Sequence, residues 1–252
     1  MLETAIQAAR AAGRLLIERL PNEREVQAKG LRDIVTDADL AAEKAIVQII
    51  RARFPDHALL TEEEGASGGD APFVWVVDPL DGTTNYSRRM PIFSVSIGLV
   101  HEGELEAGVV YDPLRDHLFV AERGRGATLN GQALQVNAID RMDYAVVGLD
   151  WAHAHRDRHE ILTRLGQIAP ACGTLRGLGS AALGLCYVAA GWIDAYFHVG
   201  LKPWDMAAGL LLIQEAGGRV TDLDGQPWQP WGQRILVSNG HIHQALLELM
   251  GT

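Results

Sequence analysis

A short apolar run followed at once by two carboxylates and a glycine is the feature that most limits how this chain folds. The run from Phe73 to Val77 is wholly apolar and rich in β-branched and aromatic residues, which predicts a strand covered on both faces. Asp78 therefore comes at the carboxyl end of that strand, where Pro79 removes a backbone donor and is expected to stop the strand ladder. Gly82 then permits a turn or a close backbone approach that a Cβ atom would block.

The backbone amides from Gly82 to Thr84 follow Asp78 and Asp81 directly. We expect these amides to converge on an anion, and a helix that begins here would add its unpaired N–H groups and its dipole. Paired carboxylates beside such donors are typical of a metal-dependent phosphatase. The formal net charge of -10 disfavours a nucleic-acid or anionic-membrane surface. It fits a phosphate substrate if divalent cations bound by clustered carboxylates reverse the local sign.

The length of 252 residues allows one large domain or two small ones, and it suffices to bury roughly three quarters of the unfolded surface. Hydrophobic residues make up 48% and charged residues 21%, which indicates neither a disordered nor a fibrous chain. Cys172 and Cys186 lack CxxC spacing, so we expect two buried thiols in a reducing cytoplasm. The start of the chain shows no signal-peptide pattern, and the longest apolar run, Ala181 to Ile193, falls short of a bilayer span. The sequence predicts a soluble cytoplasmic protein.

The order of elements changes along the chain. Apolar residues at steps of three and four predict a helix from Leu2 that Pro21 ends, and a second helix runs from about Asp39 to Arg53. A strand meander is predicted at Ile92–Val100, Gly108–Tyr111 and Leu118–Ala121, with turns at Asp112-Pro113 and Asn130-Gly131. After about residue 140 the predicted strands are Ala145–Leu149, Ala195–His198, Arg219–Thr221 and Ile235–Val237, and the predicted helices are Asp157–Ile168, Ala181–Ala190, Met206–Glu215 and Ile242–Leu249. An α+β part (1–140) and an α/β part (141–252) without a linker predict two sheets in one compact unit.

Three further acidic segments extend the first. Glu62, Glu63 and Glu64 follow an apolar stretch, Asp205 lies at the start of a predicted helix, and Asp39 is the last of three acids that open the second helix. Each has a simple alternative, because a glutamate run is usually a solvated face and a lone aspartate is often a helix cap worth about 1 kcal/mol. Their combination favours a site.

Together these segments resemble the inositol monophosphatase family, the Mg-dependent and lithium-sensitive phosphatases. The three signatures of that family occur in order, as Glu62-Glu63, then Asp78 to Asn85, then Trp204 to Gly209. Other matching segments are Lys29-Gly30 with Asp33 to Asp39, the hairpin at Leu129-Asn130-Gly131, and Arg176 with Gly179-Ser180-Ala181. The resemblance covers nearly the whole chain. It implies the five-layered αβαβα sugar-phosphatase fold, mixed α+β and α/β, in a single domain over residues 1–252.

The resemblance also implies a metal centre of two or three Mg²⁺ ions. Glu62, Asp78 and the carbonyl of Leu80 would hold the first ion, and Asp78, Asp81 and Asp205 the second. Glu62 or Glu63 would help to hold a weaker third. Mg²⁺ prefers oxygen ligands, and two such ions about 3.5 to 4 Å apart can clamp the attacking and leaving oxygens of a displacement.

The catalytic residues implied by the resemblance are Asp39, Thr83 and Glu62. Asp39 would pair with Thr83 to position and deprotonate a water on the first metal. The implied substrate contacts are Asp81, Gly82, Thr83, Thr84, Gly179, Ser180, Ala181, His198 and Asp205. A homodimer is expected from the family as well.

Two places depart from the inositol pattern. Inositol enzymes have an acidic residue seven positions before the aspartate of the Trp-Asp signature, and this chain has His198 there, which either contacts the substrate or merely ends a strand. His155 and His159 have the i,i+4 spacing of a transition-metal pair, or else form a solvated helix start. Trp151 and His153 are candidates for shaping the leaving-group pocket.

The predicted reaction is hydrolysis of a small phosphomonoester, with inositol 1-phosphate as the leading substrate. Histidinol phosphate, fructose 1,6-bisphosphate and a nucleotide of the NADP type are the alternatives within the enzyme class. A protein-interaction role is a further alternative, because some relatives act through contacts with the transcription machinery.

Overall fold

A computed structural model of the chain describes residues 1–22, 25–228 and 232–251. Among these residues the strands form a hairpin, an eight-stranded sheet and a five-stranded sheet. The hairpin consists of β1 (Val26–Gly30) and β2 (Asp33–Thr36). The larger sheet has the order β10-β9-β8-β7-β6-β5-β3-β4, with β3 Ala58–Thr61, β4 Gly65–Ser67, β5 Phe73–Asp81, β6 Ser94–His101, β7 Glu104–Asp112, β8 His117–Glu122, β9 Ala127–Leu129 and β10 Gln132–Ala133. The smaller sheet has the order β12-β11-β13-β15-β14, with β11 Val146–Leu149, β12 Thr174–Gly177, β13 Ala195–Val199, β14 Arg219–Thr221 and β15 Arg234–Ser238.

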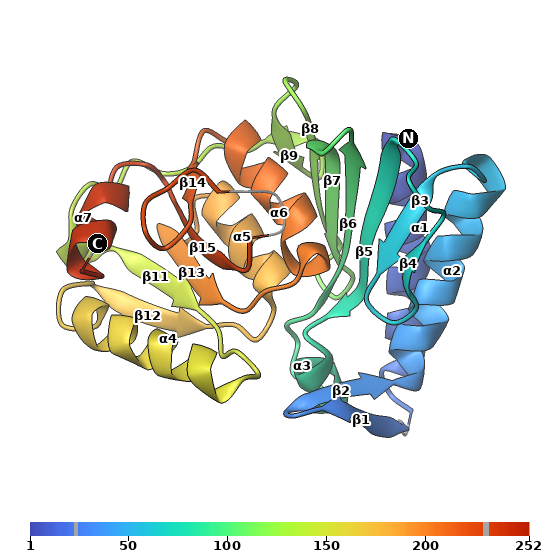
Figure 1. Cartoon of the computed structure of the whole chain (residues 1–252), viewed down its shortest axis with the longest axis horizontal. Helices are drawn as coiled ribbons and strands as arrows, with labels where there is room; N and C mark the ends of the chain where they lie inside the picture. The colour runs from blue at the N-terminus through green and yellow to red at the C-terminus, as the bar shows by residue number, and fades with distance from the viewer. Residues whose placement is uncertain (23–24, 229–231, 252) are drawn as a thin grey trace.

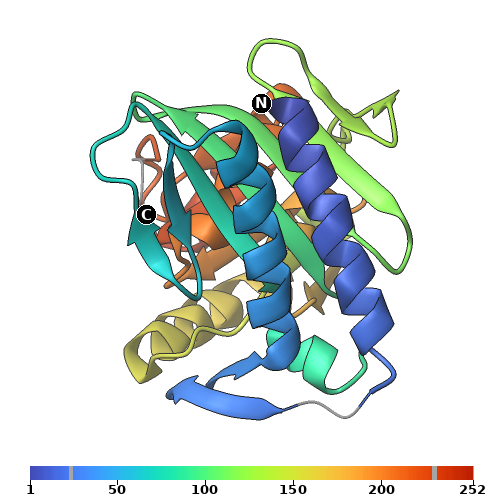
Figure 2. The same cartoon turned by 90° about the vertical axis from the view of Figure 1, so that its right-hand side faces the viewer.

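Helices cover both faces of both sheets, which gives five layers in the order αβαβα (Figure 1). Helices α1 (Leu2–Arg19) and α2 (Asp37–Arg53) lie side by side on the outer face of the larger sheet (Figure 2). Helices α5 (Ala181–Ala189) and α6 (Pro203–Glu215) lie between the sheets, and α4 (His155–Ile168) and α7 (His243–Leu249) cover the far face of the smaller sheet. One buried apolar cluster surrounds α5 and α6 between the two sheets, and two more lie under the outer helices of the larger and the smaller sheet. The predicted fold class is confirmed.

Strand β5 corrects one expectation, because Pro79 does not end it. The strand runs on to Asp81, pairing Asp78 with Ser96 and Asp81 with Ser94 across a register shift. The shift behaves as a bulge, which accommodates the missing proline donor and aims both carboxylates at one place. Gly82 follows with a φ of 97° and precedes the short helix α3 (Thr83–Ser87).

Gly82 meets both conditions that only glycine satisfies easily. Its φ lies in the left-handed region, and a Cβ atom would lie 3.0 Å from the carbonyl oxygens of both Gly179 and Ile92. The prediction of a close backbone approach is therefore confirmed. The approach joins the end of β5 to the loop before α5, and so links the two sheets at the candidate site.

Helix and strand predictions hold, with shifted ends. Helices α2, α4 and α6 begin at Asp37, His155 and Pro203, two or three residues before the predicted starts. The Asn130-Gly131 turn joins β9 to β10 with φ values of 50° and 80°. The β1–β2 hairpin and strand β12 were not predicted, because they are short and β1 is exposed along its length.

The structure also tests the expectations about membrane-spanning helices and about the two cysteines. No helix in the described ranges is both long and apolar enough to cross a membrane. Both cysteines are free, and Cys186 is buried as expected, but Cys172 is only partly buried. The prediction of two buried thiols is therefore wrong for Cys172, which lies in the turn between α4 and β12.

Candidate active site

Four carboxylates meet where the larger sheet faces α6. Strand β3 pairs in parallel with β5, Thr61 opposite Val77, so Glu62 leaves β3 beside Asp78 at the end of β5. The Ser96 hydroxyl of β6 donates to the Trp204 carbonyl at 3.1 Å and fixes the start of α6 against the sheet. These contacts bring together the side chains that we call the carboxylate cluster: Glu62, Asp78, Asp81 and Asp205.

Charges within the carboxylate cluster oppose one another. Burial, followed by the charges of Glu62, Asp81 and Asp205, raises the pKa of Asp78 well above its ordinary value. Burial, with Asp81 and Glu62, likewise raises the pKa of Asp205, against the hydrogen bond from the Lys202 amide. A group of buried carboxylates that repel one another has a strong tendency to bind either protons or a cation.

Asp81 holds the amino end of α5 as well as belonging to the carboxylate cluster. Its oxygens accept hydrogen bonds from the Ser180 hydroxyl, from the Ala182 amide at 2.9 Å and from the Ala181 amide at 3.2 Å. Burial nevertheless raises the pKa of Asp81 to about 6. Ser180 and Ala181 were predicted to contact substrate, and the structure shows both of them bound to Asp81.

Asp39 and Thr83 lie together, as the resemblance implied. The Thr83 hydroxyl lies 3.0 Å from Asp39 Oδ1 and 3.0 Å from the Leu80 carbonyl, and its single proton can be donated to one of them at a time. Asp39 Oδ2 accepts from the Thr36 amide at 2.9 Å at the start of α2. Burial raises the pKa of Asp39 to about 6, against the hydrogen bonds from Thr36.

Glu43 holds the turn formed by Glu62, Glu63 and Glu64, which we call the glutamate turn, and the sequence analysis did not predict this role. This fully buried side chain of α2 accepts hydrogen bonds from the amides of Glu63 at 2.9 Å and Glu64 at 2.8 Å. Lys29 lies on the other side of the turn, with Nζ 2.8 Å from Glu62 and 2.6 Å from Glu63. Although partial burial opposes it, these two glutamates raise the pKa of Lys29. Glu43 lies among apolar residues in the helix pattern, and that was the only signal available.

Asp150 holds the loop before α5 by accepting hydrogen bonds from its backbone amides, as Glu43 holds the glutamate turn. Asp150 Oδ1 accepts from the amides of Leu178 at 2.8 Å and Gly179 at 2.5 Å, and Oδ2 accepts from the Tyr196 hydroxyl at 3.0 Å. Asn85 donates to the Leu178 carbonyl at 2.8 Å from the opposite side. Burial raises the pKa of Asp150 to about 6. Like Asp78, it follows a buried strand, so its pattern was visible in the sequence.

His198 is buried on β13, with 5% of its surface exposed, and its Nδ1 has no hydrogen-bond partner among the described residues. Burial, followed by the nearby His153, lowers its pKa to about 4, so the ring is neutral. His155 and His159 are one turn apart on α4, as their spacing requires, but the His155 ring faces the Arg32 guanidinium.

The donors of the carboxylate cluster fit a hard cation. They are oxygen ligands, Asp78 and Asp81 are buried, and the four charges repel one another, with Lys29 paired to Glu62. Within the described ranges, however, no three His, Cys, Asp or Glu side chains are already arranged as a metal site. The assignment of individual residues to metal ions therefore stays a prediction.

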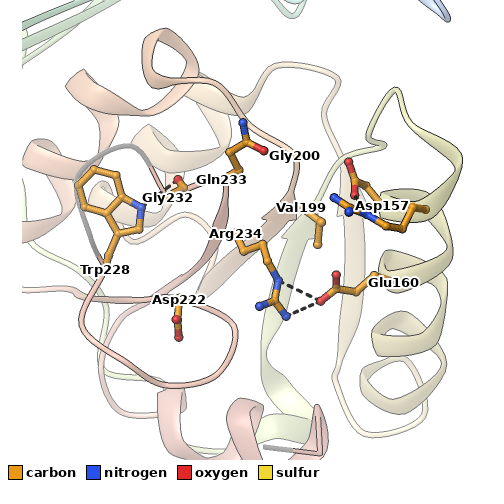
Figure 3. Close-up of a pocket in the computed structure, with 10 residues that line it drawn as sticks. Asp157, Glu160, Val199, Gly200, Asp222, Trp228, Gly232, Gln233 and Arg234 are labelled. Carbon is orange, nitrogen blue, oxygen red and sulfur yellow. Dashed lines mark hydrogen bonds and ion pairs between the residues drawn. The ribbon is translucent and has the colours of Figure 1, made fainter.

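A separate cavity of about 530 Å³ lies away from these residues, beside α4 and the ends of β13 and β15 (Figure 3). Arg234 at its wall binds Glu160 at 2.6 Å and Asp224 at 2.7 Å. Its lining includes Gly200, Asp222 and Trp228 but none of the predicted site residues. The chemistry of the carboxylate cluster therefore decides the candidate site, and the size of this cavity does not.

Comparison with known proteins agrees with the geometry. The sequence model of the inositol monophosphatase family matches residues 1–251. The chain belongs to this family. It is 42% identical to Nus factor SuhB of Escherichia coli over 254 residues, which cover 99% of this chain and 95% of the relative.

Solved structures give the same result. The structure of extragenic suppressor protein suhB from Bartonella henselae matches with a TM-score of 0.95 at 38% identity, over 98% of this chain and 97% of the other. The inositol monophosphate-bound structure of SaIMPase-II matches with a TM-score of 0.82 at 29% identity, over 98% of this chain and 91% of the other. The five-layered arrangement is thus the fold of this family.

Proposed function

We propose that this protein is a Mg²⁺-dependent phosphomonoesterase whose leading substrate is inositol 1-phosphate. The observation that carries the proposal is the carboxylate cluster, with Asp39 and Thr83 hydrogen-bonded beside it. Paired acids of this kind are otherwise costly to bury, because each raises the pKa of the others. Family membership supports the reaction class.

Glu62, Asp78, the Leu80 carbonyl, Asp81 and Asp205 are the residues that would hold the ions, with Glu63 near a third. When bound, Mg²⁺ would supply Lewis-acid stabilisation of the oxygens on phosphorus. Asp39 would accept the proton of the attacking water, and the Thr83 hydroxyl, 3.0 Å from Asp39 Oδ1, would orient that water. The amides of Gly82, Thr83 and Thr84 would bind the phosphoryl oxygens at the start of α3.

The leaving-group side differs from the inositol pattern at His198. A neutral imidazole whose Nδ1 has no partner within the described residues can donate or accept one hydrogen bond there, whereas a carboxylate only accepts. The relative that was solved with inositol monophosphate bound supports the inositol substrate. Histidinol phosphate, fructose 1,6-bisphosphate and an NADP-type nucleotide remain the alternatives that the same reaction would admit.

Phosphate release from these four substrates tests the proposal, measured with Mg²⁺ and again with EDTA. We expect preference for inositol 1-phosphate and loss of release in EDTA. Preference for another of the four substrates would leave the proposed Mg²⁺-dependent hydrolysis in place but would contradict inositol 1-phosphate as the substrate. Release that EDTA leaves unchanged, or no release from any of them, would contradict the metal-dependent reaction.

The relatives named Nus factor SuhB support a second candidate, a role in protein interaction. A site variant without phosphatase activity separates the two roles, because it would keep any protein contact made elsewhere on the surface. Partner binding by that variant is the measurement, and loss of binding together with activity would contradict separate roles.

Family membership also supports four further parts of the proposal. These are a homodimer, a single folding unit over the chain, inhibition by Li⁺ and a cytoplasmic location. Sedimentation equilibrium tests the dimer, and one cooperative transition in calorimetry tests the single unit. Titration of the phosphatase with LiCl tests the inhibition. A monomer, two transitions or an unaffected rate would each remove one of these expectations.

A further inference from the structure

The β1–β2 hairpin belongs to neither sheet, yet it reaches both halves of the molecule. Strand β1 is exposed along its whole length and pairs with β2. Lys29 in β1 reaches Glu62 and Glu63 on the larger-sheet side. In Figures 1 and 2 the hairpin extends beneath α3 and points toward α4, which covers the smaller sheet.

Arg32 at the tip of the hairpin makes the contact with the other half. Its Nη1 donates to the His153 carbonyl at 2.8 Å, and its Nη2 lies 3.0 Å from Nε2 of His155. A guanidinium has donors only, so in this contact Nε2 of His155 is the acceptor. These partners lie more than 120 residues away in the sequence.

The backbone at Arg32 is also unusual. Its φ is 60°, in the left-handed region that costs free energy for a residue with a Cβ atom. A glycine would adopt this turn more easily, so the side chain is retained there at a conformational cost. The strained residue is also the residue that makes the two contacts across the site.

The contact lies near His198, the residue that the family pattern assigns to the leaving group. His153 is close enough to His198 to help lower the pKa of that buried ring, and His198 occupies the position where inositol enzymes have an acid. Asp150, whose side chain binds the loop before α5, lies three residues before His153 in the sequence. Close to the same turn of the hairpin, Lys29 thus contacts Glu62 and Glu63, and Arg32 contacts His153 and His155.

We propose that Arg32 is a positioning residue, which clasps His153 and His155 so that the hairpin closes over the leaving group of the bound substrate and Lys29 stays on Glu62 and Glu63. This role rests on the proposed phosphatase function. All the contacting groups at the tip are exposed, so the clasp opens easily for substrate entry and product release. Closure of this kind excludes water and improves substrate orientation.

Steady-state kinetics of Arg32→Ala with inositol 1-phosphate tests the clasp. We expect KM to rise about tenfold while kcat falls less than about threefold, because the leaving group loses its cover while Asp78, Asp81 and Asp205 keep the backbone contacts that hold them. The inhibition constant of inorganic phosphate should change less than about twofold, since phosphate has no leaving group. An unchanged KM, or equal changes for substrate and phosphate, would overturn the proposal.

His155 supplies the matched pair of variants. His155→Gln keeps an acceptor oxygen near the position of Nε2, so it should restore most of the KM that His155→Ala loses. His159→Ala, one turn farther along the same exposed face, is the control and should leave KM unchanged. A glutamine variant no better than the alanine variant would contradict an acceptor role for His155.

Hydrogen exchange of the amides in residues 26–36 tests the clasp without reference to activity. We expect exchange at least about threefold faster in Arg32→Ala and His155→Ala than in the wild type, and unchanged exchange in His159→Ala. Unchanged exchange in the first two variants would show that the clasp does not hold the hairpin. If exchange accelerates but the wild type hydrolyses no phosphomonoester, the phosphatase function fails while the contact itself is confirmed.

Discussion

The carboxylate cluster and the mouth of the site, formed by the β1–β2 hairpin and residues 151–155, are held in place by different kinds of contact. In the cluster, backbone amides bind the acids: Leu80 donates to Asp78 at 2.9 Å and Lys202 donates to Asp205 at 2.7 Å. At the mouth, one exposed arginine side chain reaches a carbonyl and a histidine ring. The position of Asp78 and Asp205 therefore depends on main-chain donors that a substitution leaves in place, whereas the contact at the mouth depends on one side chain.

This difference separates the residues assigned to the hydrolysis reaction from the residues assigned to substrate choice. Among the groups assigned to hydrolysis, Asp39, Asp78 and Asp81 are buried, and backbone amides fix Asp81 to the start of α5 and Asp205 to the start of α6. The groups assigned to the leaving-group side are the exposed Arg32, His153 and His155 together with the buried His198, which departs from the inositol pattern. We therefore expect variants of the cluster to change the rate for every substrate, and variants of the mouth to change preference among substrates.

Asp78→Asn should produce the largest effect. The amide oxygen still accepts from Leu80, but one charge leaves the cluster, so kcat should fall at least about 1,000-fold, which is roughly 4 kcal/mol of barrier. Because burial and three neighbouring acids disfavour the charge, the melting temperature in EDTA should not fall. Phosphate release and a thermal melt on the same sample measure both. Near-normal activity would remove Asp78 from the metal centre.

Asp39→Asn should remove a pH-dependent contribution that the Asp39 side chain, beside the carboxylate cluster, makes to the free energy of unfolding. The folded-state pKa of Asp39, at about 6, lies above the ordinary 3.8, so its protonation favours the folded state at low pH. That contribution is complete below about pH 4 and is lost as the pH rises through about 6. The full loss corresponds to about 3 kcal/mol, at 1.36 kcal/mol per pKa unit.

The measurement is the free energy of unfolding in EDTA from pH 4 to 7 for the wild type and the variant. The variant lacks this titration, so the wild type should lose stability relative to it as the pH rises. His198 and His243, whose pKa values burial lowers to about 4, have the opposite pH dependence in both proteins and cancel in the difference. A constant difference across the range would contradict a raised pKa for Asp39.

Sequence reasoning reached most of the cluster because its signals are local. Asp78 follows an apolar strand, Asp205 opens a helix after Pro203, and Gly82 marks a turn with positive φ. Each of these depends on neighbours within a few residues. The family signatures then assigned roles that no single segment indicates.

The supporting residues were missed because their partners are distant in sequence. Glu43 binds amides about 20 residues away, and Asp150 binds amides 28 and 29 residues away. The Arg32 contact depends on how the two halves pack, which no periodicity encodes. Pro79 was misjudged for a related reason: the bulge that tolerates it is set by pairing with β6.

Glu43→Gln should produce an intermediate effect on the cluster. One of the two oxygens that hold the Glu63 and Glu64 amides becomes an amide group that cannot accept, so the glutamate turn loosens. Outer residues of this kind typically contribute 10–100-fold to metal affinity. We expect the Mg²⁺ concentration for half-maximal activity to rise about tenfold, with the rate at saturating Mg²⁺ little changed. Exposed Glu64→Gln is the control, and an equal shift in both variants would contradict a specific role for Glu43.

His198→Asn should produce the smallest effect and should change substrate preference alone. Asparagine keeps one donor and one acceptor but loses the ring that stacks on Tyr196, with a centroid distance of 6.4 Å. We expect KM for inositol 1-phosphate to rise about threefold, roughly 0.7 kcal/mol, while kcat and the Mg²⁺ requirement stay unchanged. KM values across the four-substrate panel measure this. A uniform loss of kcat for every substrate would place His198 with the cluster and would contradict the division between reaction and substrate.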